Sequence, residues 1–200
     1  MRLDLRFSTR PPGDLWCQAV AILVFQEPTM DKGVLSELNK QMSGFLTSFV
    51  ERGLWTGEAG ENFLLATQNM IKADKVLFHG MGPKTQFNEE ILKKEAMGLG
   101  SSLDKIGISE FGISIPVVEG SEKRYGSYLE LSVIDLVGVF YDRHKDDDDF
   151  LLKIIFSVER VFEGLLDSVI KELRNHFDGL LEFSIIADSR DRSKETKAAV

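Results

Sequence analysis

The feature of this sequence that most restricts its fold is an alternation between two kinds of apolar pattern. Apolar stretches of strand length alternate along the chain with stretches in which apolar residues recur at every third or fourth position. The first pattern is typical of β-strands, and the second is typical of helices that bury one side. A chain with this order of elements is expected to form an α/β domain, in which helices cover a sheet.

The patterns also predict where the elements lie. Strands are expected at residues 3–7, 17–25, 62–67, 75–80, 110–116, 150–156 and 180–186, and helices at residues 34–50, 88–105, 128–141 and 158–177. The first strand alternates apolar and charged residues, which favours a position at the edge of the sheet. The strands at 62–67 and 75–80 are joined by a short turn, so the sheet is expected to be mixed rather than purely parallel.

No linker or internal repeat divides the chain, which indicates a single domain over residues 1–186. Residues 187–200 are polar and are predicted to form a disordered tail. The broad apolar stripe of residues 158–177 is explained by packing on the sheet, and a dimer surface is the alternative. A homo-oligomer or another protein therefore remains open as the partner.

Composition and charge exclude several classes of protein. The net charge of −8 disfavours nucleic-acid binding, which requires clustered Lys and Arg. A single cysteine, Cys17, is typical of a reducing compartment. The N-terminal stretch has no apolar signal region, and no apolar run approaches the roughly 20 residues of a membrane span. We therefore expect a cytoplasmic protein with no membrane partner.

The stretch "VLFHGMGPKTQF" is the main candidate for a ligand site. It predicts a buried strand, a Gly80-x-Gly82 turn and the start of a helix, an arrangement in which backbone N–H groups can hold phosphate. Lys84 and Thr85 would assist such binding. The alternative is a tight structural turn, and it is favoured because the third glycine of a dinucleotide fingerprint is absent.

The remaining polar residues do not suggest a catalytic or metal site. The histidines His79, His144 and His176 are too scattered for a metal-ligand motif. The acidic run 146–149 lacks the spacing of a calcium loop and is expected to be a solvated turn. Cys17 is expected to be a buried small hydrophobe. The prediction is no catalytic residue, no metal and no cofactor.

Several segments in sequence order resemble the N-terminal domain of the leucyl aminopeptidases, peptidase family M17. They are "AVAILVFQEP", a helix ending near "FVERG", "WTGEAGENFLLAT", "KADKVLFHGMGPKTQFNEEILKKEAMGLGSSL" and "GSYLELSVIDLVGVFYDRHKDDDDFLLKIIF". The resemblance covers about residues 19–156. It implies a three-layer, macro-domain-like α/β fold, with a mixed β-sheet flanked by helices on both faces.

The resemblance also limits what activity to expect. The catalytic residues of the family lie in a second domain with the motif Asn-Thr-Asp-Ala-Glu-Gly-Arg, which does not occur in this sequence. No catalytic or metal-binding residue is therefore carried over, and the chain is expected not to be an enzyme. Macro domains bind ADP-ribose, but the stretch "QEPTMD" lacks the asparagine pair of those sites.

Three hypotheses follow. The preferred one is a non-catalytic, stand-alone relative of the aminopeptidase N-terminal domain with an interaction or assembly role. In that role Trp55 would be an exposed interface anchor. The second is a module that binds a nucleotide-like or other anionic ligand at Gly80, Gly82, Lys84 and Thr85. The third is a hydrolase on the same fold.

Overall fold

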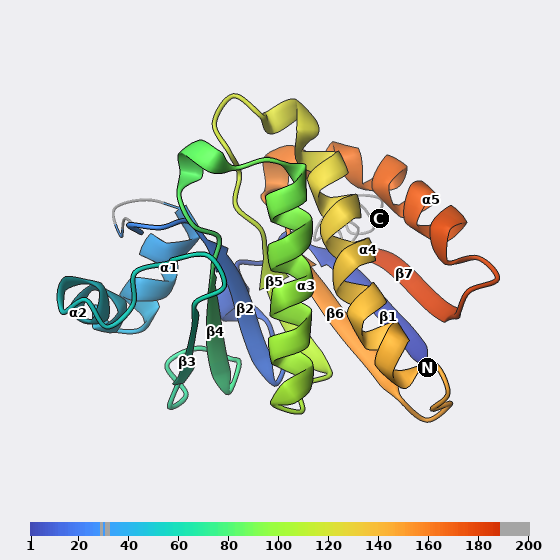
Figure 1. Ribbon diagram of the computed structural model, residues 1–200, viewed down its shortest axis with the longest axis horizontal. Helices are drawn as coiled ribbons and strands as arrows, with labels where there is room; N and C mark the ends of the chain where they lie inside the picture. The colour runs from blue at the N-terminus through green and yellow to red at the C-terminus, as the bar shows by residue number, and fades with distance from the viewer. Residues whose placement is uncertain (29, 31–32, 189–200) are drawn as a thin grey trace, which may run out of the picture.

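The computed structural model describes residues 1–28, 30 and 33–188, and in this part of the chain seven strands form one sheet (Figure 1). The strand order is β3-β4-β2-β5-β6-β1-β7. Only the β3–β4 pair of these strands is antiparallel, which confirms a mixed sheet. The strands are β1 (Arg2–Ser8), β2 (Ala19–Val24), β3 (Asn62–Ala66), β4 (Lys75–Gly80), β5 (Glu110–Ser114), β6 (Leu151–Ser157) and β7 (Glu182–Asp188).

Helices cover both faces of the sheet, so the predicted three-layer α/β fold is confirmed (Figure 1). The α-helices are α1 (Gly33–Gln41), α2 (Phe45–Glu51), α3 (Glu89–Lys105), α4 (Tyr125–His144) and α5 (Leu166–Phe177). The described part of the chain also contains 3-10 helices at Pro12–Asp14, Lys84–Gln86, Glu122–Arg124 and Arg160–Leu165. No helix among the described residues is both long enough and apolar enough to span a bilayer.

The two helical layers are unequal. The larger core cluster contains α3, α4 and α5 and one face of the sheet from β4 to β7. The smaller cluster contains α1, α2 and the opposite face of β2, β3 and β4, but no residue of β5, β6, β1 or β7. We therefore call β3, β4 and β2 the closed half of the sheet, and β6, β1 and β7 the open half.

Several predicted elements need correction. The expected helix at 34–50 is two helices, because Gly44 adopts a left-handed conformation with φ of 80°. The expected helix at 158–177 begins as the 3-10 helix Arg160–Leu165, in which Val161 is 77% exposed. β1 is not an edge strand, since it pairs with both β6 and β7.

Trp55 was expected to be exposed, but it is only 1% exposed and packs on Phe78. The predicted tail at 187–200 overlaps β7, which continues to Asp188. The rest of that tail, residues 189–200, lies outside the described residues.

Candidate functional site

The Gly80-x-Gly82 turn is explained by close contact between backbones. A Cβ atom on Gly80 would lie 2.0 Å from the carbonyl oxygen of Glu58, and Gly82 has a φ of +72°. Only glycine satisfies both conditions without displacing the neighbouring loop. The glycines therefore have a structural reason that is independent of any ligand.

The backbone N–H groups of this turn already have acceptors. Those of Gly80, Met81 and Gly82 donate to the carbonyl oxygens of Glu61, Val24 and Gly57, over 2.8, 2.7 and 3.1 Å. The turn leads only into the short 3-10 helix Lys84–Gln86, and the α-helix α3 starts at Glu89. An anion near this turn would therefore have to use groups from residues 83–85, where the side chains of Lys84 and Thr85 are exposed.

A carboxylate organises the loop that packs on this turn. Oε2 of Glu61 accepts hydrogen bonds from the N–H groups of Thr56, Gly57 and Glu58 and from the Thr56 hydroxyl, at 2.8–3.2 Å. Burial raises the pKa of Glu61, but these hydrogen bonds outweigh it and hold the pKa below its ordinary value. Glu61 therefore fixes the loop over Gly80.

Lys84 lines a cleft at the carboxyl ends of the parallel strands, which we call the carboxyl-edge cleft. Its volume is about 630 Å³, and its walls include Phe25, Ser114, Pro116 and Glu159. A smaller cavity of about 170 Å³ adjoins it and shares Ser114 and Glu159. Open α/β sheets commonly bind ligands at this edge. Of the predicted site residues, Lys84 lines this cleft, whereas Gly80, Gly82 and Thr85 do not.

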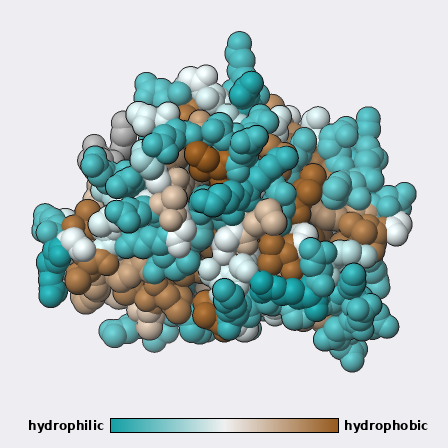
Figure 2. Space-filling view, viewed as in Figure 1, coloured by the Kyte–Doolittle hydropathy of each residue, from teal (hydrophilic) through white to brown (hydrophobic). Residues whose placement is uncertain are grey.

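Apolar side chains gather at the end of the sheet formed by β3 (Figure 2). Phe45 on α2, Leu54 just after α2 and Leu64 on β3 are 53%, 51% and 43% exposed. Phe45 also contacts Phe49, whose ring packs on Phe63 of β3. Because Phe63 and Leu65 pack on the α2 side, Leu64 points to the other face of β3. Phe45, Leu54 and Leu64 therefore flank this edge of the sheet from its two faces, and we call them the β3 patch.

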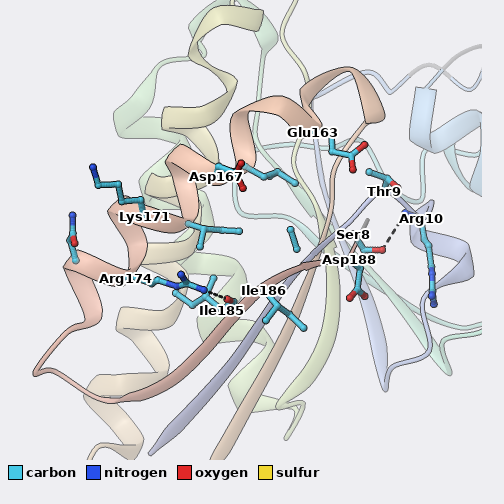
Figure 3. Close-up of a pocket in the computed structure, with 14 residues that line it drawn as sticks. Ser8, Thr9, Arg10, Glu163, Asp167, Lys171, Arg174, Ile185, Ile186 and Asp188 are labelled. Atoms are coloured by element: carbon cyan, nitrogen blue, oxygen red, sulfur yellow. Dashed lines mark hydrogen bonds between the residues drawn. The ribbon is translucent and has the colours of Figure 1, made fainter. Parts of the chain in front are cut away.

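At the opposite end of the sheet, a groove of about 840 Å³ lies between α5 and the edge strand β7 (Figure 3). We call it the β7 groove. α5 contributes Asp167, Lys171 and Arg174, which recur at helical spacing, and a guanidinium N–H of Arg174 donates to the carbonyl oxygen of Ile185 over 2.9 Å. No motif in the sequence pointed to this groove, and the charged positions of α5 at steps of three and four were its available signal.

With this geometry established, comparison with known sequences identifies the family. The profile of the cytosol aminopeptidase family, N-terminal domain, matches residues 21–134, which is more than half of the chain. The chain belongs to this family. A probable cytosol aminopeptidase of Sulfurihydrogenibium sp. is 19% identical over 96% of this chain and 37% of its own length. The chain spans well under half of the length of the curated relatives it matches.

Solved structures support the same fold for this member of the cytosol aminopeptidase family. A tomato leucine aminopeptidase mutant superposes with a TM-score of 0.60 and 9% identity, over 84% of this chain and 35% of that chain. A Trypanosoma brucei macrodomain solved in complex with ADP-ribose gives a TM-score of 0.55 and 16% identity, over 86% of this chain and 68% of that chain. Identities this low establish a shared macro-domain-like fold and no shared ligand.

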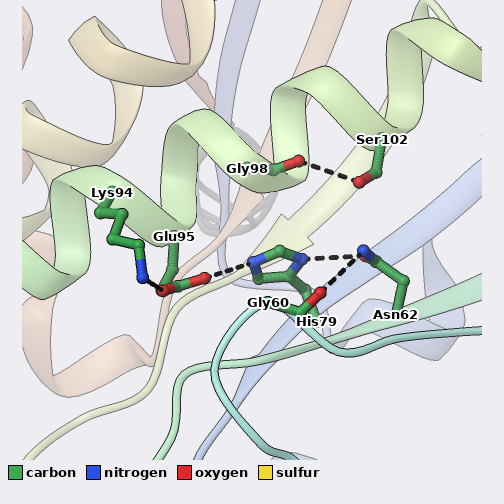
Figure 4. A network of polar contacts seen from close by, with 7 residues as sticks. All are labelled: Gly60, Asn62, His79, Lys94, Glu95, Gly98 and Ser102. Atoms are coloured by element: carbon green, nitrogen blue, oxygen red, sulfur yellow. Dashed lines mark hydrogen bonds and ion pairs between the residues drawn. The ribbon is translucent and has the colours of Figure 1, made fainter.

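Within this cytosol aminopeptidase domain, His79 belongs to a buried polar network (Figure 4). Its Nδ1 lies 2.9 Å from Oδ1 of Asn62, and its Nε2 lies 2.9 Å from Oε2 of Glu95. Lys94 approaches the other oxygen of Glu95 at 3.1 Å. Burial is the largest effect and lowers the pKa of His79, although the hydrogen bond and the charge of Glu95 act in the opposite direction. The network ties β3 and β4 to α3.

The contacts and exposure of the other candidate residues, His144, Cys17 and His176, do not indicate a catalytic or metal site. His144 lies 2.6 Å from Asp104 and stacks on Phe150. Burial raises the pKa of the Cys17 thiol to about 11, so it is a poor nucleophile near neutral pH. His176 is exposed near the end of α5. No three His, Cys, Asp or Glu side chains of the described residues, those of the run 146–149 included, surround a common point where a metal would bind.

Proposed function

We propose that this chain is a non-catalytic interaction domain of the cytosol aminopeptidase family that assembles with a second copy of itself through the β3 end of its sheet. The observation that carries the proposal is the β3 patch at the edge strand β3, whose side away from β4 has no partner among the described strands. Large apolar groups exposed together commonly mark protein interfaces. The aminopeptidase activity named for the relatives belongs to proteins much longer than this chain. As part of the proposal we place the chain in the cytoplasm, where relatives named cytosol aminopeptidases act.

The edge of β3 suits pairing with a second β3 across a two-fold axis. An antiparallel pair centred on Leu64 would place Phe63 opposite Leu65 of the second copy, and Asn62 opposite Ala66. No like charges would meet in this arrangement. Edge strands that avoid such pairing usually carry lysine, proline or a bulge. β3 carries neither a charge nor a proline.

Light scattering of the purified chain across a wide range of concentrations tests the assembly. We expect a dimer in the wild type and a monomer in Leu64→Lys, because a charge on the edge strand would be buried by pairing. Leu180→Lys is the matched control, since Leu180 is similarly exposed near β7, and it should leave the dimer intact. A wild-type monomer, or a dimer that Leu64→Lys does not alter, would remove self-assembly from the proposal.

The non-catalytic part of the proposal has its own test. Leucine amide substrates with added zinc or manganese are expected to show no turnover with the purified chain. Metal-dependent turnover that disappears on chelation would overturn it.

A second candidate function is binding of an anionic or nucleotide-like small molecule in the carboxyl-edge cleft. Lys84 favours this candidate function, because this lysine of the Gly80–Thr85 turn lines the cleft and carries a positive charge. A thermal-shift screen with ADP-ribose, nucleotides and phosphate tests it. Lys84→Ala should abolish any stabilisation, whereas Lys105→Ala, at the far end of α3, should not. Absence of a shift with every compound would exclude this candidate.

A further inference from the structure

We propose that the β7 groove binds an extended peptide of another protein as an additional strand along β7, with a basic residue of the peptide near Asp188 and an acidic residue near Lys171. The inference concerns the end of the sheet opposite the β3 patch. It extends the interaction role proposed above to a second partner, and it is independent of self-assembly.

The first basis is the free edge of β7. This strand pairs in parallel with β1 from Glu182 to Asp188, and no described strand lies on its other side. A regular edge strand presents a row of N–H and C=O groups, and peptide-binding domains use such rows to hold an extended segment. β7 has no proline, and its interior sequence from Phe183 to Ala187 is uncharged.

The second basis is the hydrogen bond between Arg174 and the carbonyl oxygen of Ile185 (Figure 3). It shows that the outward backbone groups of β7 face the β7 groove and accept donors there. Because the direction of the backbone groups repeats every two residues in a strand, the N–H of Ala187 faces the same way. Arg174 is exposed, so its side chain can turn aside and leave this acceptor to a peptide N–H.

The third basis is the distribution of charge along the β7 groove. Glu163, Asp167 and Asp188 lie toward the end of β7, where Arg10 also lines the groove, whereas Arg174 reaches the middle of β7 and Lys171 projects outward from α5 (Figure 3). Among the described residues, neither Asp167 nor Lys171 forms an ion pair. Unpaired charges of opposite sign at the two ends of a groove select both the charge pattern and the direction of a ligand.

Apolar contacts complete the site. Ile170 of α5 and Ile186 of β7 line the same cavity, and Ile186 is 40% exposed. Ile185 is buried on the α5 side of β7, so Ile186 points to the other face of the sheet. Successive side chains of an added strand also point to opposite faces, so they could pack alternately near Ile170 and near Ile186. The peptide we infer is therefore basic, then β-branched, then acidic.

A second copy of this chain fits the edge of β7 poorly. An antiparallel pair of β7 strands centred on Ile185 would place Glu182 opposite Asp188 of the other copy. Like charges directly opposite each other on paired strands are destabilising. The β7 edge therefore favours a different chain, whereas the β3 edge has no such conflict.

Fluorescence anisotropy with a labelled peptide of sequence Lys-Val-Thr-Val-Thr-Val-Glu tests the inference. This order commits to antiparallel addition, the more stable of the two ladder types. We expect saturable binding to the wild-type chain. The same peptide with alternate backbone amides N-methylated should not bind, because it cannot donate the hydrogen bonds of an added strand. Equal binding of both peptides, or no binding of the unmodified one, would overturn the proposal.

Protein variants place the binding on β7. Ala187→Pro removes an outward N–H without removing a bond to β1, and proline is tolerated at such edge positions, so it should abolish binding. Lys171→Glu should weaken binding several-fold, and Lys153→Glu, on the open face of β6, should not change it. Binding that neither Ala187→Pro nor Lys171→Glu affects would place the peptide elsewhere and overturn the proposal. If Ala187→Pro does not fold, unchanged binding to Lys171→Glu alone would overturn it.

The two proposals fail separately. A dimer that dissociates in Leu64→Lys but never binds the peptide would retain the assembly role and exclude strand addition on β7. A monomer that binds the peptide would do the reverse.

Discussion

In the closed half of the sheet, polar groups form hydrogen bonds within the chain and apolar faces are covered by helices. In the open half, part of the sheet surface and one strand edge are left uncovered by the described residues. In the closed half, the N–H groups of Gly80 and Gly82, the Glu61 carboxylate and the His79 ring all bond within the chain. In the open half, no helix of the described residues covers one face of β6 and β1, and no described strand pairs with the outer edge of β7. Parallel strands are usually covered on both faces, so the open half is the unusual one.

This difference separates fold markers from binding surfaces. The turn that most resembled a ligand site lies in the closed half, and its glycines are required by the neighbouring loop. The β7 groove has no recognisable motif, yet it offers unpaired charges and a free strand edge. A glycine-rich motif therefore reports where backbones approach each other, and only the structure shows whether anything remains for a ligand.

The largest effect that we predict is in the closed half. Glu95→Ala removes the partner of a buried histidine and should lower the free energy of unfolding by about 4 kcal/mol, because the His79 ring would lose a hydrogen bond and the truncated side chain would leave a cavity. Urea denaturation followed by circular dichroism measures the change. Glu95→Gln is the control and should cost much less, since it retains an acceptor for His79. A loss below about 1 kcal/mol in Glu95→Ala would show that the network contributes little to the stability of the closed half.

A matched pair of isoleucines compares the two halves directly. Ile22 lies on the helix-covered face of β2 and is 3% exposed, whereas Ile155 lies on the same face of the sheet in β6 and is half-buried. Ile22→Ala should cost about 3 kcal/mol, the usual cost of emptying a core site, and Ile155→Ala about 1 kcal/mol. The same denaturation experiment measures both. Equal costs would show that another surface covers Ile155 in solution, and the distinction between the halves would then apply only to the isolated chain.

Local patterns explain which parts of the fold could be predicted. The helix expected at 88–105 is α3, whose N-terminus is capped by the Asn88 side chain accepting from the N–H of Ile91. The strand at 75–80 and the glycine turn after it also follow from neighbouring residues. These features depend on residues close in the chain, so the sequence carries a direct signal for them.

The errors arise where distant residues decide the outcome. β1 lies inside the sheet because it pairs with β6 and β7, in which the partners of Arg2 are Leu151 and Glu182, 149 and 180 residues later in the chain. Trp55 is buried because it packs on Phe78 of β4, a contact that the pattern of residues around Trp55 does not reveal. The pairing of His79 with Glu95 requires α3 to cross β4. None of these contacts leaves a periodic trace in the sequence.

The smallest effect that we predict is on the open face, at Arg6. Its guanidinium contacts Asp4 at 3.0 Å on the same face of β1, with the two side chains 44% and 22% exposed. Such an exposed pair contributes little, because water solvates both charges and salt screens them. Arg6→Ala should therefore change the free energy of unfolding by less than about 0.5 kcal/mol, and added salt should reduce that small difference. A loss near that of Ile22→Ala would mean that the open face is buried against another molecule in solution, and the bare half of the sheet would then be an interface in its own right.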